Sequence, residues 1–556
     1  MKNKHKVLYI ILLIGITGAG FLWLRSYVFS DLGLAISRKI ESLKLSGFNL
    51  HYDSLSVDWK RNIVQIHGVL LEKNAYDTAC VYPEFISIGK VRAEGIRLLP
   101  LIFNSVLDFE ELYLDSARIV IRENSLFKLD SAAKRESEFT VKTDKVFVQS
   151  AELQYTDSLH CQIITVLHSN LILEGLEMEF RIDKPFAYSA KKLILDRSQV
   201  KLPLDFYTLE IKRATIDFLG EKLAVDSIKV IPDLGKVEFG RQRGYEADRF
   251  EGVVHLVRAS DFSFSILDST RVTARLAEVQ FMLKIFRDKR LPFKKVPKHL
   301  PVDMIQSLPF ELAIDSLKVT RSYIQYEEFP EEASEAGKIF FDNLYAVLSN
   351  INSGADKGHA HLNAQASMMG QGNISVSVTF PLSKNKRSSM SGSIENFPLP
   401  EINPMLTPST NIKVESGNMK KLTFNFWFND VRSDGEIELN YEDLKLISYK
   451  EDEKAKSEDL QKDNLKTFMM NTFVFRKNMD EDVPEEKRTG TVSFVRDNNR
   501  SIFNFWAKSL LSGVKSAYNL DKAAEKKTER ENKKEERTAK RLEKKLKKAE
   551  KKRDRG

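Results

Sequence analysis

Apolar and polar residues alternate with a period of two through most of the chain, from Phe48 to about Phe494. In the segment that ends at Phe428, for example, each apolar residue is followed by Thr, Asn or Trp. Each alternating run is short and ends at Gly, Asn, Asp, Ser or Pro, the residues that favour turns. The pattern predicts many short antiparallel strands, each with one face toward water and one dry face.

Several of these runs share a loose motif in which Asp-Ser separates two alternating stretches. It occurs as LYLDSARIVI, LAVDSIKVI and LAIDSLKVT, at irregular spacings. In the first copy, Leu112 and Leu114 alternate with polar residues, and Ala117 and Ile119 continue after a slip of phase. Irregular spacing excludes a repeat of fixed period, so we interpret the motif as reused strand–turn–strand units.

The period changes to a helical one in three places. Residues 26–46 carry apolar side chains at intervals of three and four, which predicts an amphipathic helix. Residues 271–290 could form a second helix. Residues 504–518 predict a third, with Trp506 and Leu510 on one face. Two segments predict loops: the charged, apolar-poor residues 450–463, and residues 382–391. The helix predicted for residues 504–518 would follow the β-rich part of the chain.

The N-terminus carries the one stretch apolar enough to cross a membrane. Val7 to Leu24 form 18 residues without a charge, and a helix of that length covers about 27 Å. Lysines precede the stretch, which favours an N-terminus inside and a body outside. A cleaved signal peptide is the main alternative, because Thr17–Gly20 are small residues. The residues predicted to anchor the chain are Val7, Ile11, Ile14, Phe21 and Trp23.

The excess of positive charge is confined to one part of the chain. Residues 521–556 hold 17 Lys and Arg against 9 Asp and Glu, which equals the net charge of +8 of all 556 residues. Residues 1–520 are therefore neutral overall and offer no basic field to nucleic acid. The tail is open to two interpretations, a solvated single helix or a disordered segment.

Motifs that would indicate catalysis are missing from the sequence. It contains no G-x-S-x-G, H-E-x-x-H, C-x-x-C, phosphate-binding loop or dinucleotide fingerprint. His359 and His361 could share a strand face and bind a metal, but two polar residues on a wet face is the better account. Cys80 and Cys161 are either two buried thiols or a disulfide. We therefore expect no catalytic site, no metal and no cofactor.

Phenylalanine is unusually abundant, with 35 residues. Alternate Phe residues on one strand face would form either the core of a sandwich or an open groove that solvates acyl chains. The residues predicted to line such a groove are Leu312, Ile314, Leu422, Phe424, Phe426, Phe428, Ile437, Leu439 and Phe494.

Three blocks of sequence resemble the AsmA-like family of bacterial envelope proteins. The first combines the N-terminal apolar stretch with DSLSVDW, IHGVLLE and IRLLPLIFNSVLDFEELYLDSARIVIRE. The second is SLKVTRSYIQYEEFPEEASEAGKIFFDNLYAVLSNI. The third runs from IKVESGNMKKLTFNFWFNDVRSDGEIELNYEDLKL through NTFVFRK to GTVSFVRDNNRSIFNFWAKSLLSGVKSAY, and is similar to the closing module of AsmA-like and DUF748-type proteins. The resemblance covers roughly residues 5–520 and does not include the charged tail.

The resemblance implies a mainly β fold: an elongated, curled antiparallel sheet forming a groove or open barrel-like structure, with an N-terminal transmembrane helix and C-terminal helices. It also implies a non-enzymatic, single-pass inner-membrane protein with its bulk in the periplasm, related to bridge-like lipid transfer proteins. The expected partners are the inner membrane, phospholipid as cargo, and outer-membrane or envelope proteins. The expected function is phospholipid transport and outer-membrane biogenesis, and the alternative is a non-enzymatic scaffold or assembly factor for outer-membrane proteins. The expected segments are 1–6 (cytoplasmic), 7–24 (anchor), 26–46 (amphipathic helix), 48–390 (β-rich body), 391–520 (C-terminal module) and 521–556 (basic tail).

Overall fold

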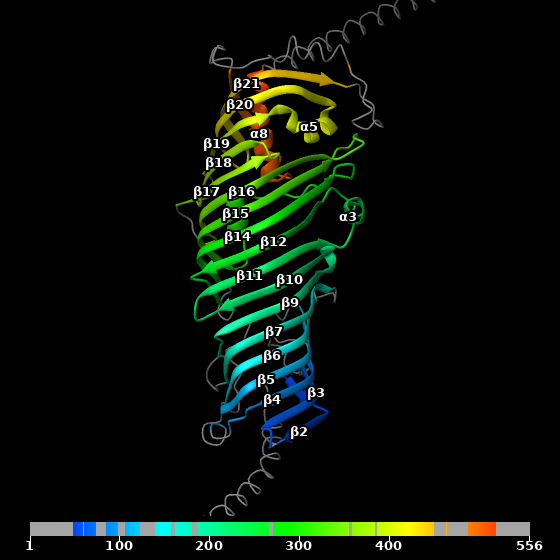
Figure 1. Cartoon of the computed structure of the whole chain (residues 1–556), viewed down its shortest axis with the longest axis vertical. Helices are drawn as coiled ribbons and strands as arrows, with labels where there is room; N and C mark the ends of the chain where they lie inside the picture. Colours follow the sequence, from blue (N-terminus) through cyan, green and yellow to red (C-terminus); the bar gives the residue numbers. More distant parts are fainter. Residues whose placement is uncertain are drawn as a thin grey trace, which may run out of the picture. The chain divides into compact units, whose positions relative to one another are not determined.

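A computed structural model of the chain describes residues 48–58, 60–73, 85–97, 100, 106–122, 139–156, 162–180, 187–265, 271–354, 358–383, 386–449, 463 and 488–518. These residues are mainly β and include few helices. Their strands form one large mixed sheet (Figure 1). Contacts along the chain define two compact units, which are described separately. Unit 1 comprises residues 1–233 and 253–271, and unit 2 comprises residues 234–252 and 272–556. Strand β12 (Asp248–Ser260) contributes residues to both.

Unit 1 is built from successive strands that pair with their neighbours in the sequence. Two short strands, β1 and β2, follow one another along the same edge of β3. In the same way, β8 and β9 both pair with β7. The order then continues through β10 to β11. The bounds are β1 Phe48–His51, β2 Ser54–Asp58, β3 Ile63–Lys73, β4 Phe85–Glu94, β5 Val106–Arg122, β6 Phe139–Thr156, β7 Gln162–Phe180, β8 Ala187–Ser189, β9 Lys192–Leu202, β10 Tyr207–Asp217, β11 Lys222–Pro232 and β13 Ser263–Ser265.

One strand pair departs from the antiparallel sheet that the sequence predicts. Strands β5 and β6 run parallel, whereas the other pairs of unit 1 with a defined register are antiparallel. A parallel pair needs a connection long enough to return the chain to its starting end, which a tight hairpin cannot provide. Residues 123–138 supply that length between the two strands. The expected all-antiparallel sheet is therefore corrected to a mixed one.

Unit 2 consists mainly of strands joined by hairpins. Strands β15 to β22 pair in sequence order and are all antiparallel. The bounds are β14 Arg271–Asp288, β15 Glu311–Phe329, β16 Gly337–Asn352, β17 His359–Met368, β18 Gly372–Pro381, β19 Ser388–Pro398, β20 Ile412–Phe428, β21 Arg432–Ser448 and β22 Thr489–Val495.

Strand β14 replaces the helix that the sequence suggested for residues 271–290. The segment RVTARLAEVQFMLKIFRD is extended along its length. The helical interpretation was wrong because the spacing of apolar residues alone does not distinguish a buried strand from a buried helix. The segment is a neighbour of β15 in the sheet, and the backbone N–H of Phe281 donates to Ser322 Oγ of that strand at 3.0 Å. Pairing with neighbouring strands thus overrides local helical spacing.

Helices are few and short except for α8. Unit 2 contains α3 (Lys236–Arg243), α4 (Pro301–Gln306), η3 (Leu399–Ile402), α5 (Asn403–Thr410) and α8 (Ile502–Ala517), and unit 1 contains the turn η2 (Pro203–Asp205). Helix α8 confirms the helix predicted for residues 504–518. Its first turn is capped by Ser501, whose hydroxyl accepts from the backbone N–H of Asn504 at 3.3 Å.

Candidate functional site

Pairing in unit 1 aligns aliphatic side chains into rows that cross the strands. Residues paired across neighbouring strands point to the same face of a sheet, so the register fixes which side chains stand side by side. The first row contains one residue from each of nine strands: Leu55, Ile66, Val91, Leu114, Val148, Leu171, Leu195, Ala214 and Val225. All nine are Leu, Ile, Val or Ala.

Two further rows have the same composition. The second lies two residues along each strand: Val57, Val64, Ala93, Leu112, Val146, Leu173, Leu193, Ile216 and Leu223. The third lies on the other side of the first: Leu50, Leu71, Ile86, Ile119, Leu153, Val166, Val200, Leu209 and Val230. We call the three rows together the aliphatic face of unit 1.

A line of irregular residues keeps the third row on the same face as the first two. In β5, Ser116 adopts a left-handed backbone with φ of 57°, between Leu114 and Ala117. Ser150 in β6 and Arg197 in β9 do the same, with φ of 52° and 49°. An inserted residue of this kind reverses the alternation that follows it. The slip of phase predicted at Asp115-Ser116 is therefore confirmed, and it lets a long strand present apolar residues to one side throughout.

The opposite face of unit 1 is mixed, because the row between the first and second aliphatic rows contains Tyr113, Phe147, Ile172 and Ile194. One of its rows is almost wholly charged: Asp58, Ile63, Glu94, Glu111, Lys145, Glu174, Lys192, Asp217 and Lys222. Tyr113 and Phe147 also lie on this face, stacked with ring centroids 4.9 Å apart, and the Arg92 guanidinium lies 4.4 Å from the Tyr113 ring. The Tyr113 hydroxyl donates to Glu111 at 2.5 Å, and this hydrogen bond raises the pKa of the phenol. The two faces of unit 1 therefore differ in composition: one carries three aliphatic rows, and the other carries both charged and apolar rows.

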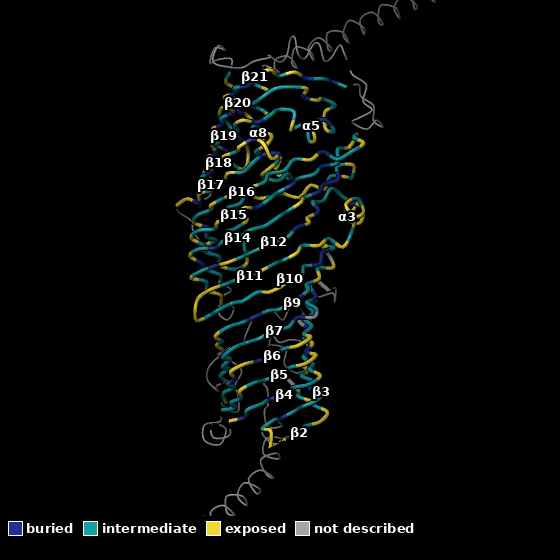
Figure 2. The backbone as a smooth tube through the Cα atoms, in the orientation of Figure 1, coloured by how far each residue is buried: buried dark blue, intermediate teal, exposed yellow. Residues whose placement is uncertain are grey.

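Most residues of the aliphatic face are only partly buried. Val64, Ala93 and Val146 fall below a tenth of their full exposure, but the larger Leu114, Leu171 and Leu195 do not. Figure 2 shows intermediate burial along most of strands β3 to β11. Among the residues of unit 1 that the structure describes, η2 is the one complete helical element, and Pro100 is the one other helical residue. No complete helix of the described part of unit 1 packs on this face.

The apolar face of unit 2 is different at its C-terminal end, because α8 packs on it. Phe424, Phe426 and Phe428 are 3%, 2% and 0% exposed and belong to one core cluster with α8. The ring of Phe428 meets Phe505 and Trp506 of α8 edge to face, with both centroid distances 6.0 Å. The rows that cross β17 to β22 thus end in a closed core.

The predicted groove residues lie mostly in that core. Leu422, Phe424, Phe426, Phe428, Ile437 and Leu439 are all at most 6% exposed. Phe494 is partly buried, with its ring 6.2 Å from Phe505. Leu312 and Ile314 are half-buried in β15, apart from the cluster. The expectation that the six buried residues line an open groove is therefore corrected: large aromatic side chains there meet a helix instead of solvent.

Small residues make room for α8. A Cβ at Gly490 of β22 would lie 2.0 Å from the backbone oxygen of Gly513, so helix and strand backbones touch at this point. The buried hydroxyls of Ser433 and Ser509 lie 2.7 Å apart, and Ser509 Oγ also donates to the Phe505 carbonyl at 2.8 Å. The sequence interpretation placed Trp506 and Leu510 on the packing face. The structure buries Phe505 and Ser509 most deeply, one residue earlier.

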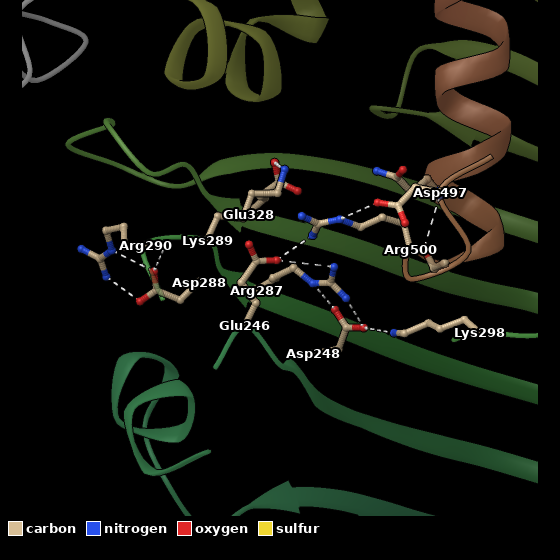
Figure 3. A network of polar contacts seen from close by, with 12 residues as sticks. Glu246, Asp248, Arg287, Asp288, Lys289, Arg290, Lys298, Glu328, Asp497 and Arg500 are labelled. Atoms are coloured by element: carbon tan, nitrogen blue, oxygen red, sulfur yellow. Dashed lines mark hydrogen bonds and ion pairs between the residues drawn. The ribbon is translucent and has the colours of Figure 1, made fainter. Parts of the chain in front are cut away.

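Buried ion pairs hold the segment before α8 against the strands of unit 2 (Figure 3). Arg287 of β14 makes two bonds to Asp248, at 2.7 and 2.6 Å. Arg500 donates to Glu246 at 2.6 Å, and Lys298 lies 3.6 Å from Asp248. The side chains of Arg287 and Glu246 are 9% and 6% exposed. Removing one partner would leave an uncompensated buried charge, so these pairs fix the position of the segment.

The same region shifts the titration of two side chains. The Arg290 guanidinium donates to Asp288 at 2.8 and 2.7 Å, and this hydrogen bonding lowers the pKa of the Asp288 carboxyl. Burial, followed by the charge of Glu328, raises the pKa of Tyr326 far above its ordinary value. A phenol with so high a pKa stays neutral and serves as a hydrogen-bond donor, here to Glu328 at 2.7 Å. These groups form a structural network and contain no proton-transfer site suited to neutral pH.

A hollow of about 660 Å³ lies over β15 to β19. Lys318 is the one charged side chain among the described residues that line it, and most of the others are Ser, Thr, Asn, Gln, Val or Ala. Several of the polar groups satisfy each other: Ser377 donates to Asn363 at 2.8 Å, and the hydroxyls of Ser375 and Ser393 lie 3.1 Å apart. Its lining offers no nucleophile paired with a base.

The remaining sequence candidates are placed as follows. His359 and His361 are exposed on β17 with stacked rings, and the described residues hold no cluster of three metal-binding side chains. Among the helices that the structure describes, none has the length and apolarity needed to cross a bilayer. The predicted anchor residues Val7, Ile11, Ile14, Phe21 and Trp23 lie outside the described residues, as do segments 26–46 and 521–556 and the two cysteines.

Comparison of the chain with protein-family models finds no match, and comparison with curated protein sequences finds no similar protein. The strongest functional feature is thus the aliphatic face of unit 1. The sequence shows the alternation in each of its strands but gives no register. For that reason the residues of its rows were not among the predicted groove residues.

Proposed function

We propose that the aliphatic face of unit 1 binds the acyl chains of phospholipids. One observation carries the proposal: three adjacent rows, each of nine aliphatic residues, share one face of the sheet. Leaving such a surface in water costs about 25 cal/mol per Å² of apolar area, and large apolar patches are rare on soluble proteins without a partner. An acyl chain removes that cost without needing hydrogen bonds.

The composition of the rows fits acyl chains better than a specific small ligand. A site for one polar ligand needs a few precisely placed donors and acceptors. The first row offers none, because its side chains are all aliphatic. Such a surface allows a chain to slide along it, since each position is chemically similar to the next. Transfer of lipid needs no covalent step, which agrees with a sequence that lacks catalytic motifs.

Placed in a cell, the proposal follows the AsmA-like resemblance. Residues 7–24 would hold the chain in the bacterial inner membrane, with the body in the periplasm. Unit 1 would then contribute to phospholipid transport and outer-membrane biogenesis as a non-enzymatic carrier with an apolar groove. The rival is a scaffold for outer-membrane proteins, and the closed core beneath α8 favours it for the C-terminal end of unit 2.

Site-specific photo-crosslinking tests the proposal. A photoreactive phenylalanine analogue is placed at Val148 of β6 or Leu195 of β9, both on the aliphatic face. The matched controls are Lys145 and Lys192, in the same strands but on the opposite face. The full chain is expressed in a Gram-negative host, irradiated in living cells, purified and examined by mass spectrometry for attached phospholipid.

We expect phospholipid adducts at Val148 and Leu195 and at least tenfold fewer at the two lysine positions. Equal labelling on both faces would mean contact with bulk membrane, and would contradict a dedicated binding face. Protein adducts at Val148 and Leu195 in place of lipid would support the scaffold instead. Either result would overturn the proposal.

A further inference from the structure

Helix α8 runs along β22, which is an edge strand among the strands that the structure describes. The backbone N–H of Thr491 donates to Ser516 Oγ at 3.2 Å, and that of Ser493 donates to Ser512 Oγ at 3.1 Å. The strand residue number rises as the helix residue number falls, so helix and strand run in opposite directions. Among the pairings of described residues with a defined register, β22 pairs with β21 alone. The exposed side chains of α8 lie on the helix surface turned away from its buried residues Phe505, Ser509 and Gly513.

That outer surface is apolar where a solvated helix would be polar. Phe503 is 67% exposed and Leu511 41%, and Ala507 between them is exposed as well. The three residues are spaced four apart and share one stripe of the helix. Exposed large apolar side chains that share one stripe of a helix indicate a binding surface.

Lysines border the stripe. Lys508 and Lys515 are exposed and seven residues apart, which places them on one side of the helix, two turns from each other. The sequence of α8, IFNFWAKSLLSGVKSA, contains no acidic residue. The residues that follow it, 521–556, carry a net charge of +8. An apolar stripe flanked by cations is the arrangement of helices that lie at the surface of anionic membranes.

We propose that the outer face of α8 docks on an anionic phospholipid bilayer. Phe503 and Leu511 enter the boundary between headgroups and acyl chains, and Lys508 and Lys515 contact lipid phosphates. A convex, positively charged helix suits a flat anionic surface, whereas a protein partner would need a groove to receive it. This proposal does not depend on acyl-chain binding by unit 1, because it concerns a different surface and a bilayer instead of single lipids.

Vesicle capture tests the docking. The full chain is incorporated into phosphatidylcholine nanodiscs, immobilised, and exposed to fluorescent vesicles of phosphatidylcholine with or without phosphatidylglycerol. The variants are Lys508→Gln/Lys515→Gln, Phe503→Ser/Leu511→Ser, and a chain that ends at Leu520 and lacks the basic tail. The matched controls are Lys212→Gln and Leu219→Ser in unit 1, whose side chains are also exposed, Leu219 to 74%.

Neutralising both lysines should weaken capture of phosphatidylglycerol vesicles about thirtyfold, since each lysine near an anionic surface contributes about 1 kcal/mol. The Phe503→Ser/Leu511→Ser chain should lose at least about tenfold, because its apolar contacts with the bilayer are removed. The control variants should bind like the original chain. Protection of α8 from limited proteolysis shows in each case that the helix still packs on β22.

Three results would overturn the proposal. Capture that depends only on residues 521–556 would assign membrane binding to the tail. Equal capture of vesicles without phosphatidylglycerol would remove the role of the lysines. Unchanged capture by the α8 variants would leave the surface to a protein partner. A failure here and a failure of photo-crosslinking in unit 1 are separate outcomes, because the two assays probe different residues.

Discussion

The aliphatic face of unit 1 and the α8-covered end of unit 2 share the same alternation of apolar and polar residues but differ in how deeply their apolar side chains are buried. In unit 1 the rows hold Leu, Ile, Val and Ala, and the larger side chains stay partly exposed. In unit 2 the rows contain Phe424, Phe426 and Phe428, which are almost wholly buried. What decides between the outcomes is the helix that packs on the second face.

Small residues contribute to this difference in burial as much as large ones do. Gly490 and Gly513 let the backbones of β22 and α8 approach closely, and Ser433 and Ser509 form a buried pair between β21 and α8. Alternation therefore identifies an apolar face. Small residues at the contact between strand and helix then allow α8 to pack closely on that face.

The largest effect in this comparison should come from truncating a covered Phe. Phe428→Ala removes a side chain that is 0% exposed and packed against Phe505 and Trp506. We expect it to lower the free energy of unfolding by about 4 kcal/mol, because a cavity remains in the closed core. Leu195→Ala on the partly exposed face of unit 1 should cost about 1.5 kcal/mol. Urea denaturation measures both, and similar losses would contradict the contrast between open and closed faces.

A matched pair of glycine substitutions tests the close contact between α8 and β22. A Cβ at Gly490 would collide with the helix backbone, whereas a Cβ at Gly89 in unit 1 would meet its nearest atom, on the Ser116 side chain, at 3.3 Å. Gly490→Ala should therefore cost about 3 kcal/mol and raise amide exchange throughout α8, and Gly89→Ala should cost less than about 0.5 kcal/mol. Unchanged exchange of α8 in the Gly490→Ala chain would show that the helix does not rest on this strand.

The buried serine pair should show a smaller, asymmetric effect. Ser509→Ala leaves the buried Ser433 hydroxyl without its partner and should cost about 2 kcal/mol. Ser433→Ala should cost about 1 kcal/mol, since Ser509 keeps its bond to the Phe505 carbonyl. A double-mutant cycle by urea denaturation measures the coupling.

In the double variant the two losses should be less than additive. The exposed pair of Ser375 and Ser393 serves as the control, where Ser375→Ala should change stability by less than about 0.5 kcal/mol. Strictly additive losses at Ser433 and Ser509 would show that the two hydroxyls do not interact.

The smallest effect is the pH dependence of the stability that the Asp288 carboxylate contributes. Because Arg290 lowers the pKa of Asp288 below the reference value of 3.8, the carboxylate stabilises the folded state fully above that value. The contribution is lost as pH falls through the lower, folded-state pKa. The denaturation midpoints of the original chain and Asp288→Asn should therefore differ at about pH 7 and converge as the pH falls below 3.8 through the lower, folded-state pKa.

The control for this titration lies in unit 1. Asp108 bonds to Arg97 at 2.7 Å, but the arginine is 42% exposed, so solvent screens the pair. Asp108→Asn should therefore have little effect at any pH. A difference between the original chain and Asp288→Asn that persists in acid would mean that the carboxylate acts through something other than its charge.

The sequence predicted much of this fold because alternation is a local property. The slip of phase at Asp115-Ser116, the end of the β-rich part near Phe494 and the helix at 504–518 are all confirmed. The helix suggested for 271–290 was wrong, since spacing alone cannot tell a buried strand from a buried helix.

The site depends on information that lies between strands. Leu114 and Leu195 are 81 positions apart in the printed sequence, and only the register places them in one row. The parallel pairing of β5 and β6 was also beyond local patterns, because it depends on how the chain returns between them. The burial of Phe424 could not be predicted either, since its covering helix lies about 80 residues later in the sequence.

The serine bonds of α8 have a consequence for the chain's behaviour among other copies of itself. An edge strand with unpaired N–H groups is a template on which another strand can add, and such addition leads to fibres. Ser512 and Ser516 occupy two of these groups on β22 with side-chain oxygens, which cannot be extended by a further strand. Removal of the two hydroxyls would leave the N–H groups of Thr491 and Ser493 without these acceptors, and would thus favour the addition of a strand at this edge.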